Sequence, residues 1–269
     1  EMEGADSYGA GWNAAGKADI VVLCLGEKRS WSGENASRST IALPNIQERL
    51  AEEMQKTGKP IVLLLSNGRP LELCRIEPLC DAILEIWQPG IAGGRPVAGI
   101  LTGRINPSGK LAMTFPYSTG QIPVYYNRRG SARRHQGFYQ DITSNPLYSF
   151  GYGLSYTTFE YGTPRATATT IGKDGTVTVG VEVTNTGQYD GTETVHWYVS
   201  DPYCSITRPL KELKYFEKQL IKAGETRKFH FHIDPLRDLG YVDGSGKRFV
   251  ESGEYVISVG KEQIKIEVK

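Results

Sequence analysis

The segment from Gly26 to Ser39 holds the residues of this chain that are best suited to chemistry. It contains two carboxylates, Glu27 and Glu34, together with a tryptophan, Trp31, and two arginines. A carboxyl group on such a loop can exchange a proton with a substrate that is held elsewhere, and an indole ring can stack on the apolar face of a sugar. The same composition also describes a charged, solvated surface loop. Residue types alone leave both interpretations open.

Short continuous apolar runs recur through the first 115 residues, at 20–25, 61–65 and 82–87. Runs of this kind, without polar alternation, are typical of strands that are buried on both faces of a parallel sheet. The loop with the two carboxylates leaves the first of these runs. Because ligands of open parallel sheets bind beyond the carboxyl ends of the strands, the loop lies where a site is expected.

Two helices are predicted among these strands. After Pro44, apolar residues recur every four positions up to Met54, and Gly58 follows them. Proline near the first turn and glycine past the end are typical of a helix, here an amphipathic one. A second helix is expected at about 96–102, after a glycine-rich turn. The alternation of strands and helices predicts an α/β layer with a mainly parallel sheet.

The rest of the chain changes character twice. Residues 116–158 are dense in Tyr, Arg, Gly, Ser and Pro with little periodicity, and their many aromatic residues predict an ordered connecting segment. From residue 159 onward, apolar and polar residues alternate in short runs that are separated by turns, as at 177–183. Such runs indicate an all-β sandwich. The predicted domains are therefore residues 1–115, 116–158 and 159–269.

Composition excludes two classes of partner. The chain has 31 Lys and Arg against 30 Asp and Glu, so no electrostatic case for nucleic acid exists. The longest apolar run, residues 61–65, is far shorter than the roughly 20 residues that a membrane helix needs. We expect neither nucleic acid nor membrane as a partner.

Metal and cofactor signals are weak. Four cysteines, Cys24, Cys74, Cys80 and Cys204, follow no metal-binding spacing, and we expect buried free thiols, with a Cys74–Cys80 disulfide as the open alternative. The histidines at 230 and 232 share one strand face, but no third ligand stands near them, so exposed or hydrogen-bonded histidines are expected there rather than a metal site. A nucleotide-binding protein is disfavoured because the glycine-rich turn lacks the GxGxxG spacing. We expect no cofactor.

A series of short motifs runs through the α/β part and continues into the β-rich tail. In the α/β part they are Gly26-Glu27, Gly33 to Arg38, Leu43-Pro44, Gly58 to Leu63, Asn67 to Pro70, Ala82 to Trp87, Asn106 to Leu111, Gln121 to Tyr126 and Leu147 to Tyr156. In the tail they are Val183 to Gly187, Arg208 to Leu213, Phe216 and Gly253 to Tyr255. The first group resembles the second domain of glycoside hydrolase family three, and the second resembles the fibronectin-III-like domain that ends many of these enzymes.

The resemblance implies a fold and a mechanism. The fold is a truncated α/β sandwich followed by a fibronectin-III-like sandwich, without the N-terminal (β/α)₈ barrel that bears the aspartate nucleophile of such enzymes. Retaining glycosidases use one carboxylate as nucleophile and a second as acid and then base, about 5–5.5 Å apart. Only the second role is available to this chain.

Site residues follow from matching the motif residue by residue. Glu34 is the expected acid/base, and its rival Glu27, directly at the strand end, is expected to be structural. Trp31 is expected to bind substrate on the aglycone side, with a role as a cover of the loop left open. Arg38 either pairs with Glu34 or anchors the loop to the following helix, and the anchoring role is favoured because an exposed pair contributes only ~0–1 kcal/mol.

The expected function is that of the C-terminal fragment of a retaining β-glycosidase, acting on β-glucosides or β-xylosides and supplying the general acid/base. Its partners would be a β-linked oligosaccharide or glycoside and the missing barrel. A non-catalytic carbohydrate-binding or scaffolding module is the alternative, and an upstream barrel-coding region would separate the two.

Two further expectations concern the chain as a whole. Residues 1–16 are acidic and rich in Gly and Ala, so we expect a chain cut from a longer periplasmic or secreted precursor. A face that the barrel would cover should also expose aromatic residues, namely Trp31, Tyr125, Tyr126 and Phe138.

Overall fold

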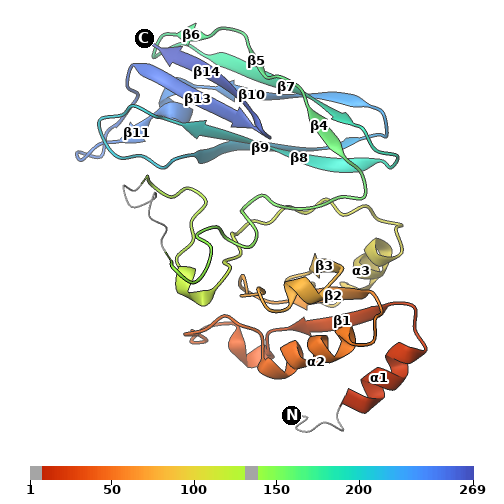
Figure 1. The fold of residues 1–269 in the computed structure, drawn as a ribbon. Helices are drawn as coiled ribbons and strands as arrows, with labels where there is room; N and C mark the ends of the chain where they lie inside the picture. The colour runs from red at the N-terminus through yellow and green to blue at the C-terminus, as the bar shows by residue number, and fades with distance from the viewer. Residues whose placement is uncertain (1–7, 131–138) are drawn as a thin grey trace. The chain divides into compact units, whose positions relative to one another are not determined.

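The computed structural model describes residues 8–130 and 139–269, which form two compact units (Figure 1). The first unit takes its residues from Glu1–Thr102, Met113–Val124 and Tyr139–Phe150. The second takes them from Gly103–Ala112, Tyr125–Phe138 and Gly151–Lys269. The predicted connecting segment therefore contributes residues to both units.

A parallel three-stranded sheet is the centre of the first unit. Its strands are β1 (Val21–Gly26), β2 (Ile61–Ser66) and β3 (Ala82–Glu85), in the order β1-β2-β3. Continuous apolar residues bury both faces of β2. The expected burial on both faces was wrong for β1, which leaves Val22 45% exposed, and β3 is only partly buried. Leu63 and Leu65 are fully buried at the middle of the sheet. The predicted α/β layer with a parallel sheet is confirmed.

Helices α1 (Gly9–Gly16), α2 (Asn45–Gln55) and α3 (Gly94–Leu101) complete this unit, with short 3₁₀ turns at Arg29–Trp31, Glu77–Leu79 and Thr119–Gln121. The predicted helix after Pro44 is α2, whose Ala51 and Met54 are buried. Helix α1 was not predicted, because its eight residues bury only Ala15 and carry almost no apolar stripe.

Two segments after the third helix, Met113–Val124 and Tyr139–Phe150, belong to the first unit and pack against each other. Phe115 exchanges backbone hydrogen bonds with Tyr148, and its buried ring lies 5.9 Å from that of Trp87. Buried Gln121 donates its side-chain amide to the carbonyls of Thr143, at 2.8 Å, and Asn145. These contacts order the described parts of the aromatic-rich segment.

The second unit is a β-sandwich with eleven named strands among its described residues. They are β4 (Phe159–Tyr161), β5 (Arg165–Ala166), β6 (Thr170–Ile171), β7 (Val177–Asn185), β8 (Gly191–Ser200), β9 (Glu212–Ile221), β10 (Thr226–Ile233), β11 (Tyr241–Val242), β12 (Arg248–Phe249), β13 (Gly253–Val259) and β14 (Glu262–Val268). One sheet has the order β10-β7-β4, with β5 also paired to β7, and the other has the order β6-β14-β13-β8-β9. A short pair, β11-β12, stands apart from both.

Alternation along the strands builds the sandwich core. Strand β7 buries every second residue, including Val179 and Val183, and fully buried Trp197 and Tyr255 fill the space between the sheets. The predicted all-β sandwich is thereby confirmed. Strand β9 was not predicted: its apolar residues do not alternate, and as the last strand of its sheet it leaves Phe216 59% exposed.

All four cysteines are free thiols, and none is fully buried. The expected burial was wrong for Cys24, which is exposed because strand alternation places its neighbours Leu23 and Leu25 on the covered face instead. Burial raises the pKa of the Cys80 thiol to about 11. Among the residues that the structure describes, no helix combines the length and apolar character needed to cross a membrane.

Candidate functional site

The carboxyl ends of all three strands of the parallel sheet meet at one edge. Gly26 pairs with Ser66, and Leu65 pairs with Glu85, so the loops that follow the three strands leave the sheet side by side. This is the edge at which ligands of open α/β sheets bind. It carries the loop that the sequence singled out.

Glu34 stands on a tight turn at the tip of that loop. The turn is closed by a hydrogen bond of 3.3 Å from the amide of Ala36 to the carbonyl of Gly33. Gly33 has φ of 119° and Asn35 has φ of 59°, values that glycine and asparagine adopt most readily. Glu34 is exposed, and within the described residues its carboxylate has no hydrogen bond or ion pair. The turn presents a free carboxylate to solvent.

Glu27 has the opposite surroundings. Its side chain is 3% exposed and lies 2.9 Å from Nε of Arg69. Its second oxygen accepts a hydrogen bond of 2.8 Å from the amide of Gly68. Both oxygens thus face fixed partners on the neighbouring loop, an arrangement that suits an anchor better than a proton-transfer group.

Arg69 ties the loop to the sheet edge. In addition to Glu27, its guanidinium contacts two backbone carbonyls, those of Trp31 and Ala36, the latter at 3.2 Å. Sequence reasoning missed this role. The signal was available, because Arg69 follows the second apolar run by a few residues, and carboxyl ends of parallel strands share an edge.

Trp31 forms a cation–π pair with Arg38. The guanidinium carbon of Arg38 lies 3.4 Å from the centroid of the half-buried indole, and Nζ of Lys28 lies 5.9 Å from it. Arg38 also donates from Nε to the carbonyl of Thr40 at 3.1 Å. Within the described residues Arg38 forms no pair with Glu34. Its contacts with Trp31 and Thr40 are local to the loop, so the predicted anchoring to the following helix stays a prediction.

Close backbone approach explains two glycines at the edge. A side chain at Gly26, whose φ is 156°, would place its Cβ 1.7 Å from the carbonyl oxygen of Ser66. A Cβ at Gly68 would lie 2.3 Å from Oγ of Ser32, which also accepts a hydrogen bond of 3.3 Å from the amide of Gln88. Glycine at both positions lets the three loops pack together.

The third strand end holds a partly buried acid that sequence reasoning also missed. Glu85 accepts a 2.7 Å hydrogen bond from the amide of Trp87, while its Oε2 is buried without a partner among the described residues. Burial raises the pKa of Glu85 to about 7, although hydrogen bonds from Trp87 and Asn67 lower it in part. A glutamate inside the apolar run 82–87 was the available signal.

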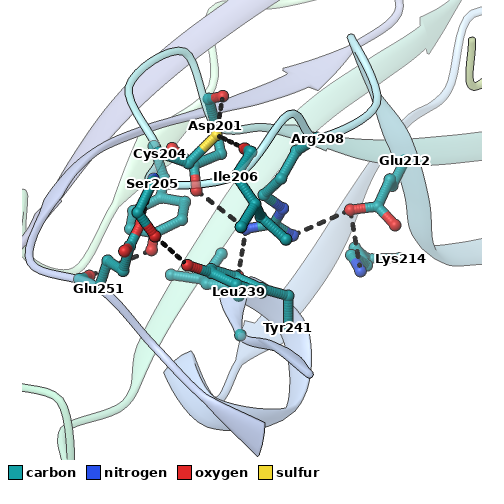
Figure 2. Close-up of polar contacts among 12 residues, drawn as sticks. Asp201, Cys204, Ser205, Ile206, Arg208, Glu212, Lys214, Leu239, Tyr241 and Glu251 are labelled. Carbon is teal, nitrogen blue, oxygen red and sulfur yellow. Dashed lines mark hydrogen bonds and ion pairs between the residues drawn. The ribbon is translucent and has the colours of Figure 1, made fainter. Parts of the chain in front are cut away.

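The second unit contains a dense polar cluster around Arg208 (Figure 2). Its guanidinium lies 2.9 Å from both Asp201 and Glu212 and donates to the carbonyl of Leu239 at 2.7 Å. An open hollow of about 820 Å³ lies beside it, lined by residues 200–210 and Gly130. Because the charges pair with each other, the cluster has the character of a structural network.

The remaining residues that the sequence singled out, three aromatics and two histidines, come later in the sequence than the three strand ends. Tyr125 is 65% exposed, and the Tyr126 hydroxyl accepts a 3.3 Å hydrogen bond from the amide of Leu213 in the second unit. Phe138 lies outside the described residues. The two strand histidines are exposed and stacked at 6.4 Å, and in the described ranges no three His, Cys, Asp or Glu side chains are grouped to hold a metal ion.

Comparison with known proteins matches both units. Residues 6–156 match the model of the glycosyl hydrolase family 3 C-terminal domain, and residues 193–263 match that of a fibronectin type III-like domain. The chain is 43% identical to a β-xylosidase of Formosa agariphila and 41% identical to a periplasmic β-glucosidase of Salmonella typhimurium, over 92% and 94% of its length. It spans 34% of the length of each.

Solved structures agree with these matches. A β-glucosidase from Listeria innocua in complex with glucose is 37% identical, with a TM-score of 0.93, and the match covers 99% of this chain and 39% of that one. A D270A mutant of the same enzyme, in complex with laminaribiose, matches with a TM-score of 0.91 and 37% identity, over 100% and 39% of the two chains. The described sheet, the sandwich and the motif order thus lead to one conclusion: the chain belongs to glycosyl hydrolase family 3.

Proposed function

We propose that this chain supplies the general acid/base of a retaining β-glycosidase and that Glu34 is that residue. The observation that carries the proposal is the contrast at the strand-end edge. One glutamate, Glu27, is buried against Arg69, whereas Glu34 is exposed on a closed turn without a partner in the described residues. A proton-transfer group must reach its substrate, and only the second glutamate is placed to do so.

The reaction would need a second carboxylate. In a retaining glycosidase the nucleophile attacks the anomeric carbon, while the acid/base protonates the leaving oxygen and then activates water. Family membership and the length of the relatives support an N-terminal barrel as the source of that nucleophile, since the chain spans about a third of each curated relative named above.

The proposed substrates are terminal β-linked glucosides or xylosides. Matched relatives include a β-xylosidase and a β-glucosidase, and a matched structure contains laminaribiose. One relative is named periplasmic, which supports an exported location for this protein. We propose Trp31 as a contact on the aglycone side, because its half-buried ring lies three residues from Glu34 and is fixed by Arg38.

The test uses the chain together with the barrel that the proposal requires. Glu34→Ala should lower kcat for alkyl glycosides and disaccharides by a factor of roughly 10²–10⁴. Activated aryl glycosides should lose much less, because their phenolate leaves without protonation. Azide should restore part of the rate for the activated substrates, since it attacks the glycosyl-enzyme without a general base.

Two variants serve as controls. Glu27→Ala should lower the yield or stability of the folded protein and show no azide rescue, because Glu34 is still present. Trp31→Ala should raise KM for substrates with a sugar or aromatic aglycone while leaving azide without effect. Azide rescue in Glu27→Ala but not in Glu34→Ala would assign the acid/base role to Glu27 and overturn the assignment to Glu34. The absence of any barrel-coding region upstream would favour a non-catalytic carbohydrate-binding module.

A further inference from the structure

A single guanidinium holds both sides of the turn that carries Glu34. Nη2 of Arg69 donates to the carbonyl of Trp31, three residues before Glu34, and at 3.2 Å to the carbonyl of Ala36, two residues after it. The two carbonyls belong to the two ends of the segment 31–36, and Glu34 lies between them on the turn. Holding both ends fixes the base of this turn.

The other side of Arg69 contacts Glu27, the first residue after strand β1. Nε lies 2.9 Å from the carboxylate of Glu27, which is 3% exposed. The backbone amide of Glu27 donates to the carbonyl of Ser66 at 2.9 Å, and its carboxylate accepts from Gly68. The carboxylate that orients Arg69 is therefore fixed at the ends of two paired strands.

The loop has few other ties to the sheet. Among the described residues, hydrogen bonds from outside the loop to residues 29–38 come only from Arg69 and from Gln88, which donates to Ser32 at 3.3 Å. The remaining bonds there are local, such as those from Trp31 to Lys28 and from Ala36 to Gly33. Arg69 accordingly carries the connection on both sides of Glu34.

From these contacts we infer that Arg69 is a positioning residue for Glu34. The inference rests on the proposed function, because it assumes that the position of Glu34 matters to a reaction. An acid/base must lie within hydrogen-bond reach of the leaving oxygen, and a displacement of about 1 Å can cost about 10²-fold in rate. Arginine suits the task because its planar fork reaches Glu27 and two carbonyls at once, which the compact ammonium of lysine cannot do.

The first measurement uses the 269-residue chain itself. Hydrogen–deuterium exchange followed by mass spectrometry reports the amides of Trp31 and Ala36, which are hydrogen-bonded within the loop. Arg69→Met should raise their exchange at least tenfold, while amides in the middle of β1 and β2 exchange as before. Glu34→Gln is the matched control: it leaves Arg69 and all of its contacts in place, so the loop should stay protected.

A second variant covers the case in which Arg69→Met fails to fold because Glu27 is left as an unpaired buried charge. The double substitution Glu27→Gln with Arg69→Met removes that charge, and it should still loosen the loop. Unchanged exchange of the Trp31 and Ala36 amides in a folded Arg69→Met or double variant would overturn the inference, whatever Glu34 does.

The second measurement separates this inference from the proposed function. In the barrel-containing enzyme, Arg69→Met should lower kcat about 100-fold for alkyl glycosides and less than about threefold for dinitrophenyl glycosides, with KM nearly unchanged. Arg69→Lys should recover only part of the loss. The positioning role would be overturned if Arg69→Met loosens the loop but does not selectively lower kcat for poor leaving groups, while Glu34→Ala does lower it. If Glu34→Ala also lacks it, the proposed function fails instead.

Discussion

Two glutamates seven positions apart show how strongly the surroundings of a residue decide what it can do. Glu27 is the first residue after β1, and its carboxylate is buried and paired. Glu34 has the same side chain and remains exposed on its turn. Burial and pairing suit a carboxylate to hold backbone in place, whereas exposure leaves it free to exchange protons.

A third glutamate gives the fold a pH dependence. The pKa of Glu85 is raised to about 7 by burial, above its ordinary value of 4.5. Between pH 4.5 and 7 the folded chain therefore keeps a proton that the unfolded chain has lost, so the free energy of unfolding falls as pH rises through this range and levels off above it. The full effect is on the order of 3 kcal/mol at most.

Glu85→Gln should remove this dependence. The amide cannot ionise, so the difference between variant and parent should grow in favour of the variant from pH 4.5 to 7. The amide can also donate where the buried Oδ1 of Asn67 has no partner among the described residues. Urea unfolding of the first unit at pH 4.5, 6 and 8 measures the difference. A difference that is constant with pH would show that Glu85 does not titrate in this range.

At the scale of elements, the connection between β8 and β9 is held by charge. Arg208, with 5% of its side chain exposed, pairs with Asp201 at the end of β8 and with Glu212 at the start of β9 (Figure 2). Burial raises the pKa of Asp201, and Arg208 lowers it in part. Two antiparallel strands thus share one buried cation at their connection.

Arg208→Met should destabilise the sandwich by about 3–5 kcal/mol, because it leaves a buried carboxylate at Asp201 without its partner. Thermal unfolding of the chain measures the effect. Adding Asp201→Asn should recover part of the loss, since the unpaired charge is gone. Lys228→Met breaks an ion pair with Glu182 in which both side chains are more than half exposed, and it should change stability by less than about 0.5 kcal/mol. Equal losses for the two single variants would contradict this account.

For the whole molecule, family membership and partial coverage of the relatives lead to an expectation about activity. The chain spans about a third of the length of the curated relatives named above. The proposed mechanism also needs a nucleophilic carboxylate, and the proposal assigns that carboxylate to a barrel rather than to this chain.

The 269-residue chain alone should therefore hydrolyse 4-nitrophenyl β-glucoside and β-xyloside no faster than buffer, because a lone acid/base cannot form the glycosyl-enzyme. Release of nitrophenolate over many hours measures this. The chain with its barrel is the positive control. Turnover by the chain alone that disappears in Glu34→Gln would contradict the need for a second domain.

Local periodicity and turn residues were sufficient to predict much of this protein. Apolar runs predicted the three parallel strands, four-residue spacing predicted α2, and alternation predicted β7 and the sandwich, because burial on one or two faces follows directly from residue order. Strand β9 and helix α1 escaped prediction because neither shows a clear apolar period.

The sequence by itself determined the two fold classes and the family motifs, including a loop with two candidate glutamates. Only the tertiary structure decided that the side chain of Glu27 is buried and that Arg69, from the next strand end, contacts the backbone on both sides of Glu34. It also decided that Glu85 lies in surroundings that raise its pKa. The first two depend on contacts between residues 33 to 42 positions apart. The chain order lists such residues separately, and only the register of the parallel sheet brings them to one edge.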